Sequence, residues 1–146
     1  MEFFQALEQP QLDCLVYSND PGWTVLQVFA HLISAEKAFS LLIEDILSGG
    51  PGAPETFDID RFNEEEMKEL SSLAMGELVI DFQKSRALNI RQIAELSLED
   101  LARVGRHPFL GMTSLEEIIK LLYRHNQIHQ RDVRRFLNPR LAGSVE

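Results

Sequence analysis

The chain has 146 residues, of which 45% are hydrophobic and 25% charged, and its formal net charge is −9. This length and balance are typical of one globular domain, spanning residues 1–146, and exclude a disordered chain. An acidic surface repels phosphate groups, so we expect neither a nucleic acid nor an anionic membrane surface as a partner.

The N-terminal segment predicts a short helix without targeting features. Phe3, Phe4 and Leu7 recur with helical spacing, and Pro10 either kinks this helix or begins a new one. The opening residues lack the basic and apolar regions of a signal peptide, and no run approaches the roughly 18 apolar residues of a membrane span. Cys14 is the only cysteine, which excludes an intrachain disulfide, and we interpret it as a small buried hydrophobe rather than a nucleophile. These features favour a cytoplasmic location.

The clearest predicted helix begins at Thr24 and ends before Gly49 and Gly50. Thr24 and Gln27 have the spacing of a capping box, and the two glycines suit a left-handed helix end. One apolar stripe runs along this helix, made of Val28, Leu32, Ala35, Phe39, Leu42 and Ile46.

A second long helix is predicted to open at Asn63, with Glu66 at the capping-box position, and to continue through Gly76. Residues 50–60 are rich in glycine and proline and are predicted to form the loop before it. A short helix capped by Ser97 follows. The seam of the second helix is made of Met67, Leu70, Leu73 or Ala74, Leu78, Phe82, Ser85 and Leu88.

The last long helix is predicted to follow a turn-rich connector, residues 105–113. Thr113 and Glu116 have capping-box spacing, and Pro139 marks the end of the helix. No stretch shows the period-two alternation of a strand, so the sequence predicts an all-α four-helix bundle. The apolar face of this helix contains Leu115, Ile118, Leu122, Val133 and Phe136.

Three of the four histidines fall on these apolar faces. His125 and His129 complete the seam of the last helix, and His31 lies between Val28 and Ala35 on the first long helix. In one interpretation, each is a core histidine satisfied by its own hydrogen bonds, since an unpaired buried imidazole costs about 1–3 kcal/mol. In the other, a divalent metal explains all three, because a His-x3-His pair and a histidine from a facing helix can reach one ion.

Three neutral imidazoles leave a coordination position open, which is typical of catalytic rather than structural sites. A water in that position would have its pKa lowered toward neutrality.

Other polar residues have simpler interpretations: His107 as a solvated turn residue, although it could overhang the metal, and Trp23 as a packing residue. Glu36, Asn126 and Asp132 could be pocket groups but are more simply polar-face residues. Arg131, Arg134 and Arg135 suit the C-terminal end of a helix dipole, and the alternative is that they attract an anionic substrate.

Two segments carry a family resemblance. "GWTVLQVFAHLISAE" resembles the Trp-Thr/Ser-x-x-x-Val-x-x-His-Leu-x-x-Ala-Glu opening of the second helix in the DinB-like (YfiT-like) family. "GRHPFLGMTSLEEIIKLLYRHNQIHQRDVRR" is similar to that family's closing pattern, in which a Gly-x-His-Pro turn and a Thr-Leu-x-Glu-x-Leu helix start precede His-x-x-x-His. Both occur in order, so the resemblance covers nearly the whole chain.

The resemblance implies an up-down-down-up bundle that is often a homodimer. It also implies a nickel, zinc or similar divalent ion held by three histidines, which correspond to His31, His125 and His129 in this sequence. Characterised branches of that family use the site for low-molecular-weight thiol chemistry on small molecules. We therefore expect a metal-dependent transferase or hydrolase, such as a thiol S-transferase. The alternative is a non-catalytic metal- or ligand-binding bundle in the stress response; a solvent-accessible position beside the ion would favour the enzyme.

Overall fold

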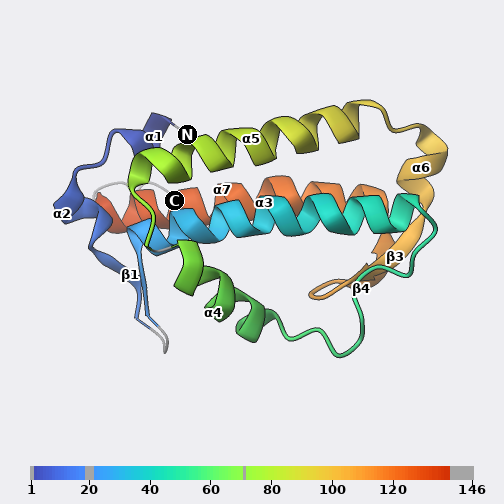
Figure 1. Cartoon of the computed structure of the whole chain (residues 1–146), viewed down its shortest axis with the longest axis horizontal. Helices are drawn as coiled ribbons and strands as arrows, with labels where there is room; N and C mark the ends of the chain where they lie inside the picture. The colour runs from blue at the N-terminus through green and yellow to red at the C-terminus, as the bar shows by residue number, and fades with distance from the viewer. Residues whose placement is uncertain (1, 19–21, 71, 139–146) are drawn as a thin grey trace, which may run out of the picture.

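The computed structural model describes residues 2–18, 22–70 and 72–138. Long helices dominate this part of the chain, and a short antiparallel strand pair precedes the first and the last of them (Figure 1). In chain order the elements are α1 (Glu2–Gln5), α2 (Gln9–Leu12), β1 (Leu15–Tyr17), β2 (Trp23–Thr24), α3 (Val25–Leu47), α4 (Ile59–Leu70), α5 (Met75–Ala94), α6 (Leu98–Ala102), β3 (Val104–His107), β4 (Gly111–Ser114) and α7 (Leu115–Leu137).

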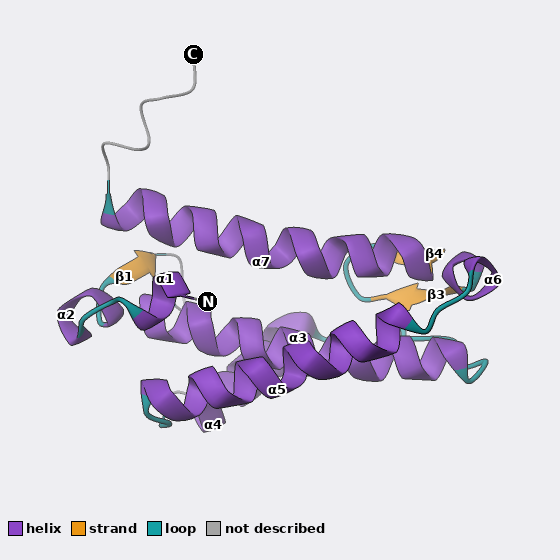
Figure 2. Ribbon diagram, turned by 90° about the horizontal axis from the view of Figure 1, so that it is seen from above, coloured by secondary structure: helices purple, strands orange, loops and turns teal. Residues whose placement is uncertain are grey.

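The three long helices α3, α5 and α7 form the bundle, with α3 at its centre. Helix α3 packs against both α5 and α7. Figures 1 and 2 show that α3 and α5 run in the same direction and that α7 returns along them. The long connection that parallel neighbours require contains α4. This arrangement confirms the predicted all-α class and the helical bundle.

Helix α3 is the core helix that its sequence predicts. The Thr24 hydroxyl accepts a hydrogen bond from the Gln27 N–H, and the Gln27 side-chain oxygen accepts one from the Thr24 N–H. Gly49 has φ +85° just after the end of the helix. By length and composition α3 is apolar enough to cross a membrane, yet 67% of its most apolar window is buried inside the bundle. Its place in the core accounts for its hydropathy.

The predicted second helix is wrong in both its start and its continuity. Helix α4 begins four residues before Asn63, and the Asp58 carboxylate accepts the Arg61 N–H there. Helix α4 ends at Leu70, and a separate helix, α5, begins at Met75. At its start the Ala74 N–H donates a hydrogen bond to the Glu77 side chain. Gly76 therefore lies in a first turn, where its conformational freedom costs little. Leu88 is 53% exposed, and Asn89 takes the inward position.

The connector before the last helix is a β-hairpin, which the sequence reasoning missed. Strands β3 and β4 pair antiparallel, with His107 opposite Gly111. Four-residue strands are too short for a visible alternation, and this pair is held by packing: a Cβ added at Gly105 would lie 2.4 Å from the Ile46 Cγ1. Thr113 pairs within β4, so the cap of α7 is Ser114, which accepts the Glu117 N–H.

The far end of α7 and the N-terminal segment differ from expectation in detail. Phe136 is 44% exposed, and the helix ends at Leu137; Pro139 lies outside the described residues. Pro10 lies in the first turn of a new helix, α2, so the predicted N-terminal helix is two short helices that cover one end of the bundle (Figure 2). Phe4 anchors them by stacking on Phe29 of α3, with ring centroids 4.9 Å apart.

The hydrophobic core consists of two clusters. One cluster joins the N-terminal half of α3 to α5 and to the end of α7, and the other joins the C-terminal half of α3 to the start of α7. Along α7, Leu122 belongs to the second cluster and Val133 to the first, and His125 and His129 lie between them. The histidines therefore occupy a polar layer within the core.

Candidate metal centre

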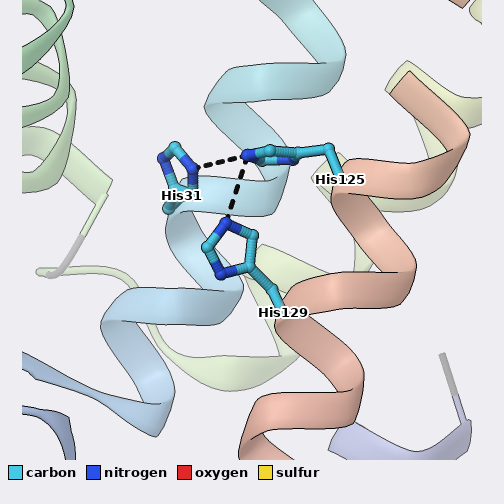
Figure 3. A group of neighbouring side chains, drawn as sticks. All are labelled: His31, His125 and His129. Carbon is cyan, nitrogen blue, oxygen red and sulfur yellow. Dashed lines mark hydrogen bonds between the residues drawn. The ribbon is translucent and has the colours of Figure 1, made fainter. Parts of the chain in front are cut away.

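His31, His125 and His129 come together between α3 and α7, as the seam analysis predicted (Figure 3). Each offers one ring nitrogen, and these nitrogens all lie within 4.8 Å of one another. Nε2 of His125 is 2.9 Å from Nε2 of His31 and 3.2 Å from Nε2 of His129. The helical spacing of four residues places the two α7 rings on one face, and α3 supplies the third ring from across the interface.

Hydrogen bonding alone does not account for this geometry. A neutral imidazole has one N–H and one lone pair, and Nε2 of His125 faces two other Nε2 atoms. In addition, the buried Nδ1 atoms of His31 and His125 have no hydrogen-bond partner among the described residues. Contacts among the described residues therefore leave these two ring nitrogens without a partner.

The spacing of the nitrogens fits a metal ion instead. Zinc–nitrogen bonds are about 2.0–2.1 Å long, which puts two tetrahedral ligand nitrogens about 3.3 Å apart. The observed Nε2 separations of 2.9 and 3.2 Å are close to this value. Three neutral imidazoles are also the donor set that zinc and nickel prefer.

Burial keeps the three rings neutral, which metal binding requires. Burial lowers the pKa of His31 to about 3 and that of His125 to about 4, and neighbouring histidines lower both further. Burial also lowers the pKa of His129, although the Asp132 carboxylate opposes this effect. At neutral pH each ring therefore has a lone pair available for an ion.

Tyr17 fixes the tautomer of His129. The Tyr17 hydroxyl donates to Oδ2 of Asp132 at 3.2 Å, because a carboxylate can only accept. The same hydroxyl oxygen lies 2.8 Å from Nδ1 of His129, so Nδ1 is the donor and carries the proton. Nε2 of His129 is then unprotonated and faces the other two rings. Burial, followed by the Asp132 charge, raises the pKa of Tyr17 to about 12, so the hydroxyl stays protonated.

Glu36 forms a second polar centre beside the histidines. Its side chain is fully buried, and its carboxylate accepts hydrogen bonds from Arg86 and Asn89 of α5 and from Asn126 of α7. The Asn89 and Asn126 bonds are 2.7 and 2.8 Å long. Asn126 follows His125 directly, so this network holds α7 in register against α3. Glu36 and Asn126 therefore point inward, and their simpler interpretation as polar-face residues is wrong.

The sequence reasoning missed three of these residues. Asn89 had a signal, since positions 78, 82, 85 and 89 keep helical spacing along α5. Tyr17 lies in a three-residue strand with no readable period, and Arg86 is adjacent to the seam rather than on it. Chain order alone therefore did not indicate their inward positions.

The three histidines open onto a cavity of about 880 Å³. It lies between α3 and α7 on one side and residues 52–66 and the β3–β4 hairpin on the other. Trp23 lines it and packs on His31, with ring centroids 4.8 Å apart, as its interpretation as a packing residue predicts. Most of the lining is apolar or aromatic, and it includes Phe39, Phe57, Phe62, Phe109, Leu121 and Ile128.

The remaining candidates lie elsewhere or differ from expectation. His107 is buried and lines the cavity, so the interpretation as a solvated turn residue is wrong. Arg131 pairs with Asp132, and Arg134 lies over the Phe3 ring. The described lining of the cavity includes no arginine, which argues against an anionic substrate being drawn in by this cluster. Cys14 is half-buried, and its thiol contacts the Pro10 carbonyl oxygen.

Fold and site together define an all-α bundle that presents three converging histidines to an apolar cavity. Residues 2–133 match the sequence profile of the DinB superfamily, and the chain belongs to this superfamily. No curated protein sequence matches the chain significantly.

Solved structures that share the fold include the mycothiol-dependent maleylpyruvate isomerase, with a TM-score of 0.75, and a histidine-to-alanine variant of that enzyme, with a TM-score of 0.74. Each is 16% identical to this chain over 90% of its length. The match covers 53% of either structure, so this chain spans about half the length of that enzyme. At this identity the likeness concerns the fold alone.

Proposed function

We propose that this protein is a metal-dependent enzyme acting on small molecules, a transferase or hydrolase in which His31, His125 and His129 hold one divalent ion, zinc or nickel. The observation that carries this proposal is the convergence of three Nε2 atoms at the wall of a large cavity. A closed structural site would be capped by a fourth side chain, whereas here the histidines line open space.

A divalent ion held there would supply Lewis-acid activation, by which a water or thiol loses its proton near neutral pH. The chain's own residues would orient the ligands and shape the space around the ion. His129 presents its Nε2 lone pair because Tyr17 and Asp132 hold its Nδ1 proton. The apolar lining excludes bulk water from the reacting groups, which strengthens electrostatic interactions at the site.

A low-molecular-weight thiol is the cosubstrate that we favour. The structural neighbours are named for their dependence on mycothiol, and they share the bundle that carries the histidines here. The only cysteine, Cys14, takes no part in the cluster, so a nucleophilic thiol would come from outside the chain. The transfer of a thiol to an electrophile is therefore the first reaction to test, and hydrolysis by an activated water is the second.

The alternative is a non-catalytic bundle that binds a metal or ligand in the stress response. The cavity beside the histidines supports the enzyme, because a metal with only a structural role needs no adjoining space for a substrate. An assay decides between them. The purified chain, loaded with zinc or nickel, is mixed with glutathione, bacillithiol or mycothiol and with an electrophile such as 1-chloro-2,4-dinitrobenzene.

We expect conjugation above the uncatalysed rate with at least one of these thiols. It should disappear after chelation of the metal and in His129→Ala, and return when the ion is restored to the wild type. Activity that survives both treatments would contradict the metal-dependent mechanism. A chain that binds the ion but accelerates neither thiol transfer nor ester hydrolysis would favour the non-catalytic alternative.

We further propose that residues 1–146 act as a single domain in the cytoplasm and as a homodimer, without a nucleic-acid or membrane partner. The net charge of −9 supports the absence of anionic partners. The exposed aromatic side chain of Tyr123 on α7 is compatible with a second copy packing there. Light scattering during size-exclusion chromatography gives the mass, and a monomer at micromolar concentration would contradict the dimer.

A further inference from the structure

His107 holds a fixed hydrogen-bond donor at the wall of the cavity. It is the last residue of β3, and its Nδ1 accepts the backbone N–H groups of Phe109 at 3.0 Å and Leu110 at 3.3 Å. Since Nδ1 accepts, the proton of the neutral ring is on Nε2. Burial lowers the pKa of His107, which favours this neutral form. The turn of the hairpin thus sets the tautomer.

The ring itself is held in place at the wall of the cavity. It stacks on Phe39 of α3, with centroids 5.3 Å apart and an interplanar angle of 29°. His107 lines the same cavity as the three clustered histidines. Among the described residues, no hydrogen-bond partner contacts its Nε2, so this N–H is available to a molecule in the cavity.

The charges around the cavity disfavour an anionic occupant. Its described lining contains one cation, Lys37, and the ammonium of Lys37 pairs with Asp81 at 3.4 Å. Asp45 and Glu66 also line the cavity and are acidic. A carboxylate entering this space would lose its hydration without gaining a free cation from the chain. Aromatic and aliphatic side chains form most of the remaining wall, which suits an apolar body.

We propose that the cavity binds a neutral, mainly apolar small molecule and that His107 selects it by donating its Nε2–H to an acceptor oxygen such as a carbonyl. This inference rests on the proposed function only in making that molecule the acceptor substrate. Binding itself needs His107 and the cavity, and it can be measured without the ion. His107 is then a specificity-determining residue at some distance from the reacting thiol or water.

Three matched compounds separate the parts of this proposal. Benzophenone has the acceptor oxygen, diphenylmethane has the same rings without it, and 4-benzoylbenzoate adds a negative charge. Their affinities for the full chain are measured by displacement of the neutral dye 1-aminoanthracene, after chelator treatment and again with zinc. We expect benzophenone to bind about fivefold more tightly than diphenylmethane, the usual effect of one hydrogen bond. We expect 4-benzoylbenzoate to bind at least about tenfold more weakly than benzophenone in the chelator-treated chain.

The matched variant is His107→Asn. An asparagine oxygen can replace Nδ1 as the acceptor for the two backbone N–H groups, but it leaves no donor at the position of Nε2. We expect this variant to keep its fold by circular dichroism and to lose the preference for benzophenone. If it does not fold, His107→Gln, which retains an N–H near the position of Nε2, is expected to keep the preference. Ala38→Phe, which fills the cavity, should weaken all three compounds, and Ala87→Phe on exposed α5 surface should weaken none.

The possible results test the binding proposal, the role of His107 and the metal proposal separately. No displacement by any compound, equal affinities of benzophenone and diphenylmethane, or tight binding of the carboxylate would each overturn the proposal. A preference that persists in His107→Asn would overturn the role of His107. Zinc titration of the same samples keeps the proposed function separate. A chain that prefers the ketone but binds no zinc would lose only the metal proposal, and one that binds zinc without the preference would lose only this one.

Discussion

Tyr17 is the residue that sets the tautomer of His129, and with it the nitrogen that is free to bind a metal ion. It links the Asp132 carboxylate to Nδ1 of His129 through its hydroxyl. Tyr17→Phe removes that oxygen and leaves the ring in place, so His129 can adopt either tautomer. We expect zinc affinity to fall by about tenfold to a hundredfold, as for other losses of a ligand's hydrogen-bond partner. Competition with a chromophoric chelator measures this affinity.

The other tyrosine provides the control for this prediction. Tyr123 is on α7 and is 61% exposed, and its hydroxyl accepts a hydrogen bond from the Gln127 side chain rather than from a histidine. Tyr123→Phe should leave zinc affinity unchanged. Equal affinities for Tyr17→Phe and the wild type would show that the hydroxyl does not position His129.

Glu36 is expected to matter for stability more than any exposed carboxylate. Glu36→Ala leaves the Arg86 guanidinium and two amide groups without their acceptor inside the core. Removing one partner of a buried ion pair costs about 3–5 kcal/mol in the free energy of unfolding. Urea denaturation measures this change, with Glu44→Ala on the exposed side of α3 as the control, for which a change within about 0.5 kcal/mol is expected. Similar values for the two variants would contradict the proposed role of the network.

At the residue scale, periodicity predicted the triad but not its surroundings. His31, His125 and His129 fall on seams of long helices, where one position in the sequence defines one direction in space. Tyr17 reaches His129 across 112 positions of sequence, from a short strand whose direction depends on how the N-terminal segment packs. No local pattern carries that information.

At the scale of elements, the loop at Gly52 builds one wall of the cavity. Residues 51–53 pair with Arg106 of β3: its N–H donates to the Pro51 carbonyl, and its carbonyl accepts the Ala53 N–H, both at 2.8 Å. Gly52 has φ +84°, and a Cβ there would lie 2.5 Å from the backbone N and O of Arg106. Both its conformation and the close approach of the two backbones therefore require glycine.

Gly49 has only the first of these two requirements, the left-handed backbone conformation, and not the close approach of another backbone. It has φ +85°, but a Cβ there would meet nothing within 4 Å. Gly49→Ala should cost about 1–2 kcal/mol in the free energy of unfolding, the usual penalty for a left-handed residue. Gly52→Ala should cost clearly more and should also weaken 1-aminoanthracene binding, because the loop must leave β3. Denaturation curves and dye titrations measure both effects, and equal costs for the two variants would contradict this view of the loop.

Element boundaries show where sequence patterns are ambiguous. Asp58 and Asn63 are both good capping residues, and so are Thr113 and Ser114, but packing decides which one begins the helix. Thr113 is taken by the β4 strand, and Asp58 is preferred because Phe62 packs against Phe57 from within the first turns of α4. The apolar residues continue with helical spacing from α4 into α5, so the sequence pattern does not reveal that the helix ends between them and the chain changes direction.

At the scale of the whole molecule, the buried histidines should make the metal-free protein acid-sensitive. An unfolded histidine titrates near pH 6.5, whereas the folded pKa of His31 is about 3 and that of His125 about 4. Between these values the unfolded chain binds more protons, so this stability is fully present above about pH 6.5 and is lost as the pH falls toward 3. His31 alone should account for a loss on the order of 3 kcal/mol between pH 7 and pH 4.

The comparison variant is His31→Leu, which keeps an apolar side chain at the position and cannot titrate. Urea unfolding of both chelator-treated proteins at pH 7 and pH 4 gives the two losses of stability, and carboxylate effects cancel in their difference. The wild type should lose more than the variant. Equal losses would contradict the burial of a neutral ring at this position.

The fold as a whole was predictable because three long helices carry it. Their stripes, and the caps of α3 and α6, determine the all-α class and which faces meet. Two helices differed from prediction: the second long helix is divided into α4 and α5, and the N-terminal helix is divided near Pro10 into two pieces that cover one end of the bundle. The cavity was not predictable, since it is walled by a loop and a hairpin that the sequence analysis treated as connectors.

The central claim is that three histidines hold one metal ion, and metal titration tests it most directly. The chain is purified without a polyhistidine tag, stripped of metal, incubated with zinc or nickel, dialysed and analysed for metal content. We expect one ion per wild-type chain, one per chain of His107→Asn, and a loss of at least about a hundredfold in affinity for His129→Ala. A wild type that stays metal-free after incubation with both ions would contradict the assignment of His31, His125 and His129 as ligands.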